Sequence, residues 1–204
     1  ATYAENTSED IEVSVITCSP GQEVYSLYGH TAIRVRDKER GTDYVFNYGV
    51  FDFNTEHFAW KFVLGKTDYI CAAAPWQYFT REYEKRGSSV IAQVLNLTTS
   101  EAIKIRDYLL NNISKENCVY RYNYLTNNCT TRVMDCIDSC IEGNLVYSWK
   151  DTLMTYRDIL HQYTQDYPWT QDGNDLLLGA DVDTVLSHRA TCFIPEYYMD
   201  ALSN

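Results

Sequence analysis

The chain has 204 residues, of which 45% are hydrophobic and 22% are charged, and its formal net charge is −11 at pH 7. These values are typical of a globular protein and exclude a disordered chain. The acidic excess, without any run of Lys or Arg, excludes the basic surface that nucleic-acid binding requires and disfavours adhesion to anionic lipid by charge alone.

The length suits one domain over 1–204, with a loose lead-in at 1–10 and a helical and loop appendix at 144–204. Strands are predicted from alternating apolar residues and following turns at 11–17, 30–36, 44–49, 66–73, 88–97 and 119–125. Helices are predicted from apolar residues at helical spacing at 76–85, 98–112, 129–141, 152–165 and 195–202.

Two segments have less regular patterns. The aromatic stretch 51–62 is expected to form a short helix or a lid. The stretch 167–183 contains Pro and Gly and is expected to be an extended loop with a short turn. Its acidic residues lack the spacing of an EF-hand. They are Asp172, Asp175, Asp181 and Asp183.

The seven cysteines cannot all pair within one chain, so at least one thiol is free or pairs between chains. Their spacing matches no zinc-finger or zinc-ribbon pattern, and we expect neither a metal nor a cofactor. No apolar run approaches the roughly 20 residues of a membrane-spanning helix. The first residue is Ala1 rather than Met, which indicates an exported protein without its signal peptide, or a trimmed chain.

The segment 127–132 carries the best candidate for a nucleophile. Asn128 is a preferred N-cap residue, so a helix should begin at about Cys129 and stop near Gly143. In the first turn, the free N–H groups and the helix dipole favour a thiolate and can bind an oxyanion, a role that Asn128 would support. The alternative is a small core cysteine that happens to lie near a cap.

A cysteine nucleophile needs a base, and the base needs a group that orients it. His30 is preferred because it begins a strand of the sheet that leads into the Cys129 helix, and Gly29 leaves room for a substrate. In a hairpin that turns at 38–41, Asn47 lies opposite His30 and is the predicted orienting residue. A structural histidine is the alternative. The other histidines are expected to be wall, surface or packing residues: His57, His161 and His188.

The order His30, Asn47, Cys129 resembles that of the circularly permuted papain-like group, which includes NlpC-related and lecithin:retinol acyltransferase proteins. More closely, the chain resembles the N-terminal periplasmic domain of the Lnb-type lipoprotein N-acyltransferase family. The matching segments are TCSPG at 17–21, YGHTAIRV at 28–35, FNYGVFDF at 46–53, YRYNY at 120–124, NCTTR at 128–132, YPW at 167–169 and PEYYMD at 195–200. Family members typically continue into membrane-spanning helices, whereas this chain ends at Asn204.

The resemblance implies an α+β, circularly permuted papain-like (NlpC-related) fold, with an antiparallel sheet packed on the Cys129 helix. It also implies a periplasmic or cell-envelope acyltransferase with Cys129 and His30 as its catalytic pair. The acyl chain would pass from a phospholipid, through a Cys129 thioester, to the N-terminal amine of a lipoprotein. Two alternatives remain open: a cysteine amidase or peptidase acting on cell-wall peptides, and a non-catalytic envelope binding module. A polar groove favours the amidase and an apolar trough favours the acyltransferase.

Overall fold

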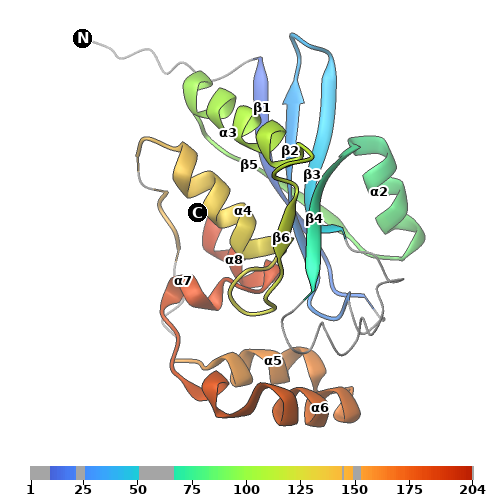
Figure 1. The fold of residues 1–204 in the computed structure, drawn as a ribbon, viewed down its shortest axis with the longest axis vertical. Helices are drawn as coiled ribbons and strands as arrows, with labels where there is room; N and C mark the ends of the chain where they lie inside the picture. Colours follow the sequence, from blue (N-terminus) through green and yellow to red (C-terminus); the bar gives the residue numbers. More distant parts are fainter. Residues whose placement is uncertain (1–9, 22–25, 51–66, 144, 149–152, 204) are drawn as a thin grey trace.

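The computed structural model describes residues 10–21, 26–50, 67–143, 145–148 and 153–203. Its centre is a six-stranded antiparallel sheet with the strand order β5-β1-β2-β3-β4-β6 (Figure 1). The strands are β1 (Ile11–Cys18), β2 (His30–Asp37), β3 (Thr42–Val50), β4 (Asp68–Pro75), β5 (Val90–Val94) and β6 (Val119–Arg121). The antiparallel sheet that the sequence predicted is therefore present.

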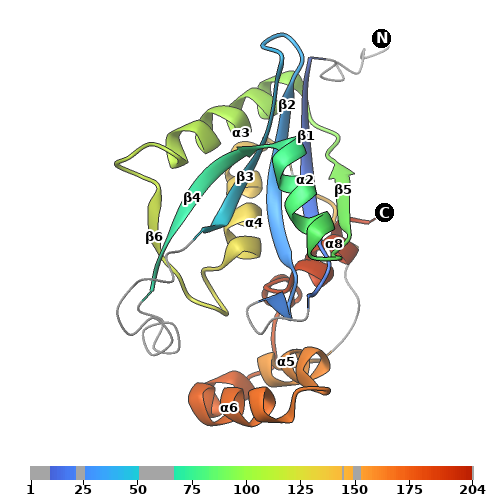
Figure 2. The same cartoon turned by 90° about the vertical axis from the view of Figure 1, so that its right-hand side faces the viewer.

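Helices cover both faces of this sheet, so the fold is α+β as predicted. In Figure 2, α2 lies in front of the sheet and α3 and α4 lie behind it, while α5 and α6 lie beyond one end of the strands. The helices are α2 (Trp76–Lys85), α3 (Thr99–Asn112), α4 (Cys129–Cys140), α5 (Tyr156–Thr164), α6 (Pro168–Leu178), α7 (His188–Thr191) and α8 (Pro195–Leu202). A 3₁₀ helix, η2 (Gly179–Asp183), follows α6.

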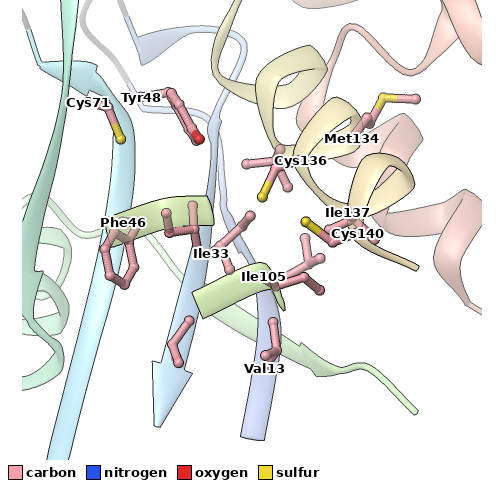
Figure 3. Packing of buried hydrophobic residues seen from close by; sticks show 14 of the residues in the cluster. Val13, Ile33, Phe46, Tyr48, Cys71, Ile105, Met134, Cys136, Ile137 and Cys140 are labelled. Carbon is pink, nitrogen blue, oxygen red and sulfur yellow. The ribbon is translucent and has the colours of Figure 1, made fainter. Parts of the chain in front are cut away.

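The alternation of side chains in β1 and β2 divides the apolar residues between two cores. Val13 and Ile33 face α3 and α4, whereas Ile16 and Ala32 face α2. Helix α4 buries a stripe of Val133, Cys136, Ile137 and Cys140, which are the residues at helical spacing expected for 129–141 except Ile141, which lies beyond the end of the helix. Figure 3 shows Cys136, Ile137 and Cys140 of this stripe beside Ile33 and Ile105. Burial of each large apolar side chain stabilises the fold by roughly 1.5–3 kcal/mol, so the α4 helix is held firmly on the sheet.

The predicted strand 119–125 is wrong in its second half, because β6 ends at Arg121. The Asn123 side-chain oxygen accepts hydrogen bonds from the N–H groups of Leu125 and Thr126, both at 3.0 Å. An Asn side chain that bonds the backbone two residues on replaces the ladder by a turn. The chain therefore turns before α4, and this turn brings Tyr124 to the start of the helix.

The predicted extended loop 167–183 is also wrong, because α6 and η2 occupy it. Pro168 is the first residue of α6, a position at which the missing N–H costs nothing. Gly173 lies inside the helix, where an added Cβ would meet no atom within 4 Å. Gly179 then ends the helix with φ = +64°. The Pro and Gly residues that suggested a loop thus mark the start and the end of a helix.

Two predicted helix boundaries differ from the structure. Helix α5 begins at Tyr156 rather than 152, because Thr155 and Asp158 form a capping box. Leu153 lies within the predicted helix 152–165 but precedes α5 and is 90% exposed. Helix α4 ends at Cys140, before the predicted stop near Gly143, because Ile141 is already extended (ψ = 146°). The lead-in 1–9 and the aromatic segment 51–62 with His57 lie outside the described residues.

Candidate active site

Cys129 is the first residue of α4, and Asn128 is the N-cap, as predicted. The Asn128 side-chain oxygen accepts from the N–H groups of Thr130 (2.9 Å) and Thr131 (3.0 Å). Its amide nitrogen donates to the carbonyls of Tyr124 (2.8 Å) and Phe193 (2.9 Å). Asn128 is buried, and its side chain forms all four hydrogen bonds that an amide allows. It therefore fixes the start of α4 against the segments that contain Tyr124 and Phe193.

The Asn128 cap reduces the number of backbone N–H groups that can bind an oxyanion at the start of α4. Thr130 and Thr131 give their N–H groups to the Asn128 side chain, and the Arg132 N–H donates to the Asn128 carbonyl at 3.1 Å. Of the first-turn donors, only the Cys129 N–H has no such bond within the described part of the chain. The helix end therefore offers one backbone donor beside the thiol, rather than several.

His30 begins β2, and its imidazole is oriented by Asn47 of β3. The distance between His30 Nε2 and Asn47 Oδ1 is 2.8 Å. The same oxygen accepts from the Gly49 N–H at 2.7 Å, and because an N–H can only donate, this atom must be the amide oxygen. His30 Nε2 therefore carries a hydrogen, which leaves Nδ1 for the thiol. The contact that the hairpin register predicted is present, and the catalytic roles of both residues stay predictions.

Gly49 leaves the space that the His30 ring fills. A Cβ at position 49 would lie 2.7 Å from His30 Cε1 and 3.0 Å from Asn47 Oδ1. On its other side the imidazole faces the Tyr83 ring, with 6.4 Å between ring centroids and 10° between planes. The need for glycine at position 49 was not predicted. The only indication of it in the sequence is that Gly49 comes two residues after Asn47.

The charges of Cys129 and His30 stabilise each other. Burial raises the pKa of the Cys129 thiol, but the charge of His30 and hydrogen bonds from His30, the Thr31 backbone and Thr130 more than offset it, so the pKa lies below its usual value. Burial lowers the pKa of His30, but the charge of Cys129 and hydrogen bonds with Cys129 and Asn47 raise it above its usual value. These opposite shifts favour a thiolate–imidazolium pair.

Three other cysteines do not combine a lowered pKa with a position at the cavity that Cys129 lines. All seven cysteines are free, and burial raises the pKa of Cys18 and of Cys71 to about 12. Hydrogen bonds from Cys136 and Ser139 lower the pKa of Cys140 to about 7, but this thiol lies in the core at the far end of α4. Cys129 therefore combines a lowered pKa with a position at a cavity.

The cavity above Cys129 has a volume of about 80 Å³. Its walls are aromatic and apolar, and they include Tyr28, Tyr122, Tyr124, Phe193, Ile194 and Pro195. Among the described lining residues, His30 is the only one with an ionisable nitrogen. The sequence did not predict that Tyr28 and residues 193–195 line the site, because they come from opposite ends of the chain.

Two of the four acidic residues in the stretch 167–183 take part in ion pairs. Asp175 and Asp183 both pair with Arg157, and Asp175 also contacts His161 Nε2 at 2.9 Å. His161 thus lies at the contact between α5 and α6. No group of three or more His, Cys, Asp or Glu side chains within the described ranges is arranged to hold a metal ion.

The family model that matches the chain is described as the Lnb N-terminal periplasmic domain, and it covers residues 1–162. No curated protein and no solved structure matches the chain. The matched range ends inside α5, so Phe193, Ile194 and Pro195 lie beyond it. In the part of the chain that the structure describes, no helix is both long and apolar enough to cross a membrane.

Proposed function

The chain belongs to the family of Lnb N-terminal periplasmic domains, and from this membership we propose that it is a thiol-dependent acyltransferase of the cell envelope. Its donor is a phospholipid and its acceptor is the N-terminal amine of a lipoprotein. The proposal also places the fold in the circularly permuted papain-like group, because a strand histidine and its orienting Asn precede a cysteine at a helix start.

One observation carries this proposal: the Cys129–His30 pair, with its opposite pKa shifts, opens into an aromatic and apolar cavity. Such walls suit the apolar side of a lipid ester. A peptide substrate with a free carboxylate calls for an Arg or Lys, and none is found among the described lining residues. The lowered pKa of Cys129 also supports catalysis over a purely structural role.

In the first half-reaction, the Cys129 thiolate attacks the ester carbonyl carbon, and negative charge develops on the carbonyl oxygen beside the Cys129 N–H. The ester C–O bond then breaks, and the His30 imidazolium gives its proton to the departing lysophospholipid oxygen. The products are an acyl thioester and a neutral imidazole, which Asn47 holds through Nε2.

In the second half-reaction, the acceptor amine attacks the thioester carbonyl. His30 takes a proton from the attacking nitrogen, and the C–S bond breaks with the electron pair returning to sulfur. The amide product leaves, and the thiolate–imidazolium pair is restored. Each half-reaction thus uses His30 once as an acid or a base.

The test is the intact mass of the protein after incubation with phospholipid micelles, before and after neutral hydroxylamine. We expect an acyl adduct on the wild type that hydroxylamine removes and that Cys129→Ala lacks. Cys118→Ala, which removes a half-buried thiol outside the cavity, is the matched control and should keep the adduct. Rapid alkylation of Cys129 at low pH without any adduct would favour the amidase. Slow alkylation as well would indicate a binding module.

A further inference from the structure

The proposed reaction places a negative charge on the carbonyl oxygen in both half-reactions. Sites of acyl transfer commonly direct two or more hydrogen-bond donors at this oxygen. In this protein the Asn128 cap occupies the N–H groups of Thr130 and Thr131, so the first turn of α4 offers the Cys129 N–H. A second donor has to come from another wall of the same small cavity.

Tyr28 lies in this wall, and its hydroxyl is held in place by a residue far away in the sequence. The Asn174 side-chain nitrogen, in α6, donates to Tyr28 Oη at 2.9 Å. The Tyr28 ring packs between Tyr124, with 5.1 Å between centroids, and Tyr163, with 5.8 Å. Rings on two sides and an amide at the oxygen leave the hydroxyl little freedom to turn away.

The hydrogen bonds of Tyr28 leave its own proton available. Burial raises the pKa of Tyr28, whereas hydrogen bonds from Tyr124 and Asn174 lower it in part. Burial is also the main cause of the raised pKa of Tyr124, and its hydrogen bond with Tyr28 raises that pKa further, as expected if Tyr124 donates. Both phenols are therefore protonated at neutral pH. Tyr28 Oη accepts from Tyr124 and Asn174, and its O–H is left to donate.

We propose that the Tyr28 hydroxyl is the second oxyanion donor, facing the Cys129 N–H across the cavity, and that Asn174 is the residue that positions it. Tyr28 keeps its proton throughout: it hydrogen-bonds the oxygen that gains charge when the thiolate adds, and His30 alone transfers protons. This inference rests on the proposed function. Because Asn174 lies beyond residue 162, a helix outside the family match completes the site.

Single-turnover acylation by a short-chain p-nitrophenyl ester tests this role, with alkylation of Cys129 by iodoacetamide as a parallel reaction. Alkylation displaces iodide from a saturated carbon and forms no oxyanion. We expect Tyr28→Phe to slow acylation by about 10²–10³-fold and to leave alkylation unchanged. Asn174→Ala should slow acylation roughly tenfold, mainly in the rate at saturating ester, because the hydroxyl remains but loses its fixed direction.

Tyr163→Phe is the matched control. It removes a hydroxyl that donates to Glu196 at 2.6 Å but keeps the ring that contacts Tyr28, so both rates should match the wild type. Acylation of Tyr28→Phe at the wild-type rate would overturn the inference and leave the proposed function standing. Equal losses in both reactions would also overturn it, by showing a general disturbance of the thiol. A wild type that alkylates rapidly but is never acylated would remove the proposed function and this inference together.

Discussion

Among the groups that lower the pKa of Cys129, His30 has the largest effect, through its charge and its hydrogen bond. Without the imidazole, burial of the thiol is offset only by the hydrogen bonds from the Thr31 backbone and Thr130, so the pKa of Cys129 should rise. For His30→Ala we therefore expect the alkylation profile to move to higher pH, with the rate at pH 7 falling about tenfold for each unit of pKa increase. His161→Ala, which alters a histidine paired with Asp175, is the control and should leave the profile unchanged. The measurement is the rate of Cys129 alkylation between about pH 5 and pH 10, followed by intact mass.

The wild-type pH dependence follows from the same two shifts. The thiolate is present above the lowered pKa of Cys129, and the imidazolium is present below the raised pKa of His30. Acylation needs both charged forms, so its pH profile should be bell-shaped, limited on the acid side by loss of the thiolate and on the alkaline side by loss of the imidazolium. An acylation rate that keeps rising until the pH reaches the ordinary pKa of a thiol would contradict the thiolate–imidazolium pair.

Gly49 is the residue that permits the present position of the imidazole. A Cβ there would lie 2.7 Å from His30 Cε1, closer than packed carbon atoms approach, so Gly49→Ala should displace the ring and break its bond to Asn47. We expect alkylation at pH 6 to fall at least about tenfold, with unfolding curves changed by less than about 1 kcal/mol. In Gly143→Ala, where an added Cβ meets nothing within 4 Å, alkylation should match the wild type.

The sequence predicted those site residues whose roles follow from residues close to them in the chain. Asn128 was identified by its cap preference, and Asn47 by the register of one hairpin. Tyr28 was not identified as a donor, because its partner Asn174 lies 146 residues away and no pattern in the sequence joins them. The need for glycine at position 49 was not predicted either, because it appears only when the position of the His30 ring is known.

At the scale of elements, the Asn128 cap holds together three segments: α4, the turn at Tyr124 and the chain at Phe193. Asn128→Ala should lower the free energy of unfolding by about 2–4 kcal/mol, because it removes the cap and leaves two carbonyls unpaired. Asn128→Asp keeps the accepting oxygens but loses the donated bonds and adds a negative charge beside the thiol.

In Asn128→Asp a carboxylate oxygen faces the two carbonyl oxygens in a buried position, so we expect at least as large a loss of stability as in Asn128→Ala, together with a higher thiol pKa. Urea unfolding and the alkylation profile separate the two effects. Thr98→Ala removes the analogous cap of α3, away from the site, and should cost about 1 kcal/mol without moving the profile. Equal profiles for the two Asn128 variants would argue against the charge effect.

Elements with strong local signals were predicted correctly, and those governed by competing signals were not. Helix α3 follows its capping box of Thr98 and Glu101, and helix α2 follows its apolar spacing. Helix α6 was missed because Gly173 and the flanking Pro and Gly lower helix propensity, while ion pairs of Asp175 and Asp183 with Arg157 stabilise it from outside. These tertiary contacts carry no signature within the segment itself.

At the scale of the whole molecule, Arg157 joins the C-terminal helices to one another. It bonds Asp175, Asp183 (2.6 Å) and the Gly179 carbonyl (2.6 Å). Arg157→Ala should speed hydrogen exchange in residues 168–183 and leave β1, β2 and β3 unchanged, because those strands belong to a different core. Arg121→Ala removes a comparable surface pair with Asp68 and should leave 168–183 unchanged. Faster exchange across the sheet in Arg157→Ala would show that the two regions unfold together.

The bond between Asn128 and the Phe193 carbonyl also sets an order of events during biogenesis. A chain that emerges N-terminus first can form β1 to β6 and α4 before residues 193–195 are delivered. Until residue 193 arrives, the cap lacks one of its acceptors and one wall of the cavity is missing. The thiol thus acquires its finished surroundings last, after the sheet that carries its histidine. The site therefore matures only once residues 193–195 are in place, and these residues lie outside the family match.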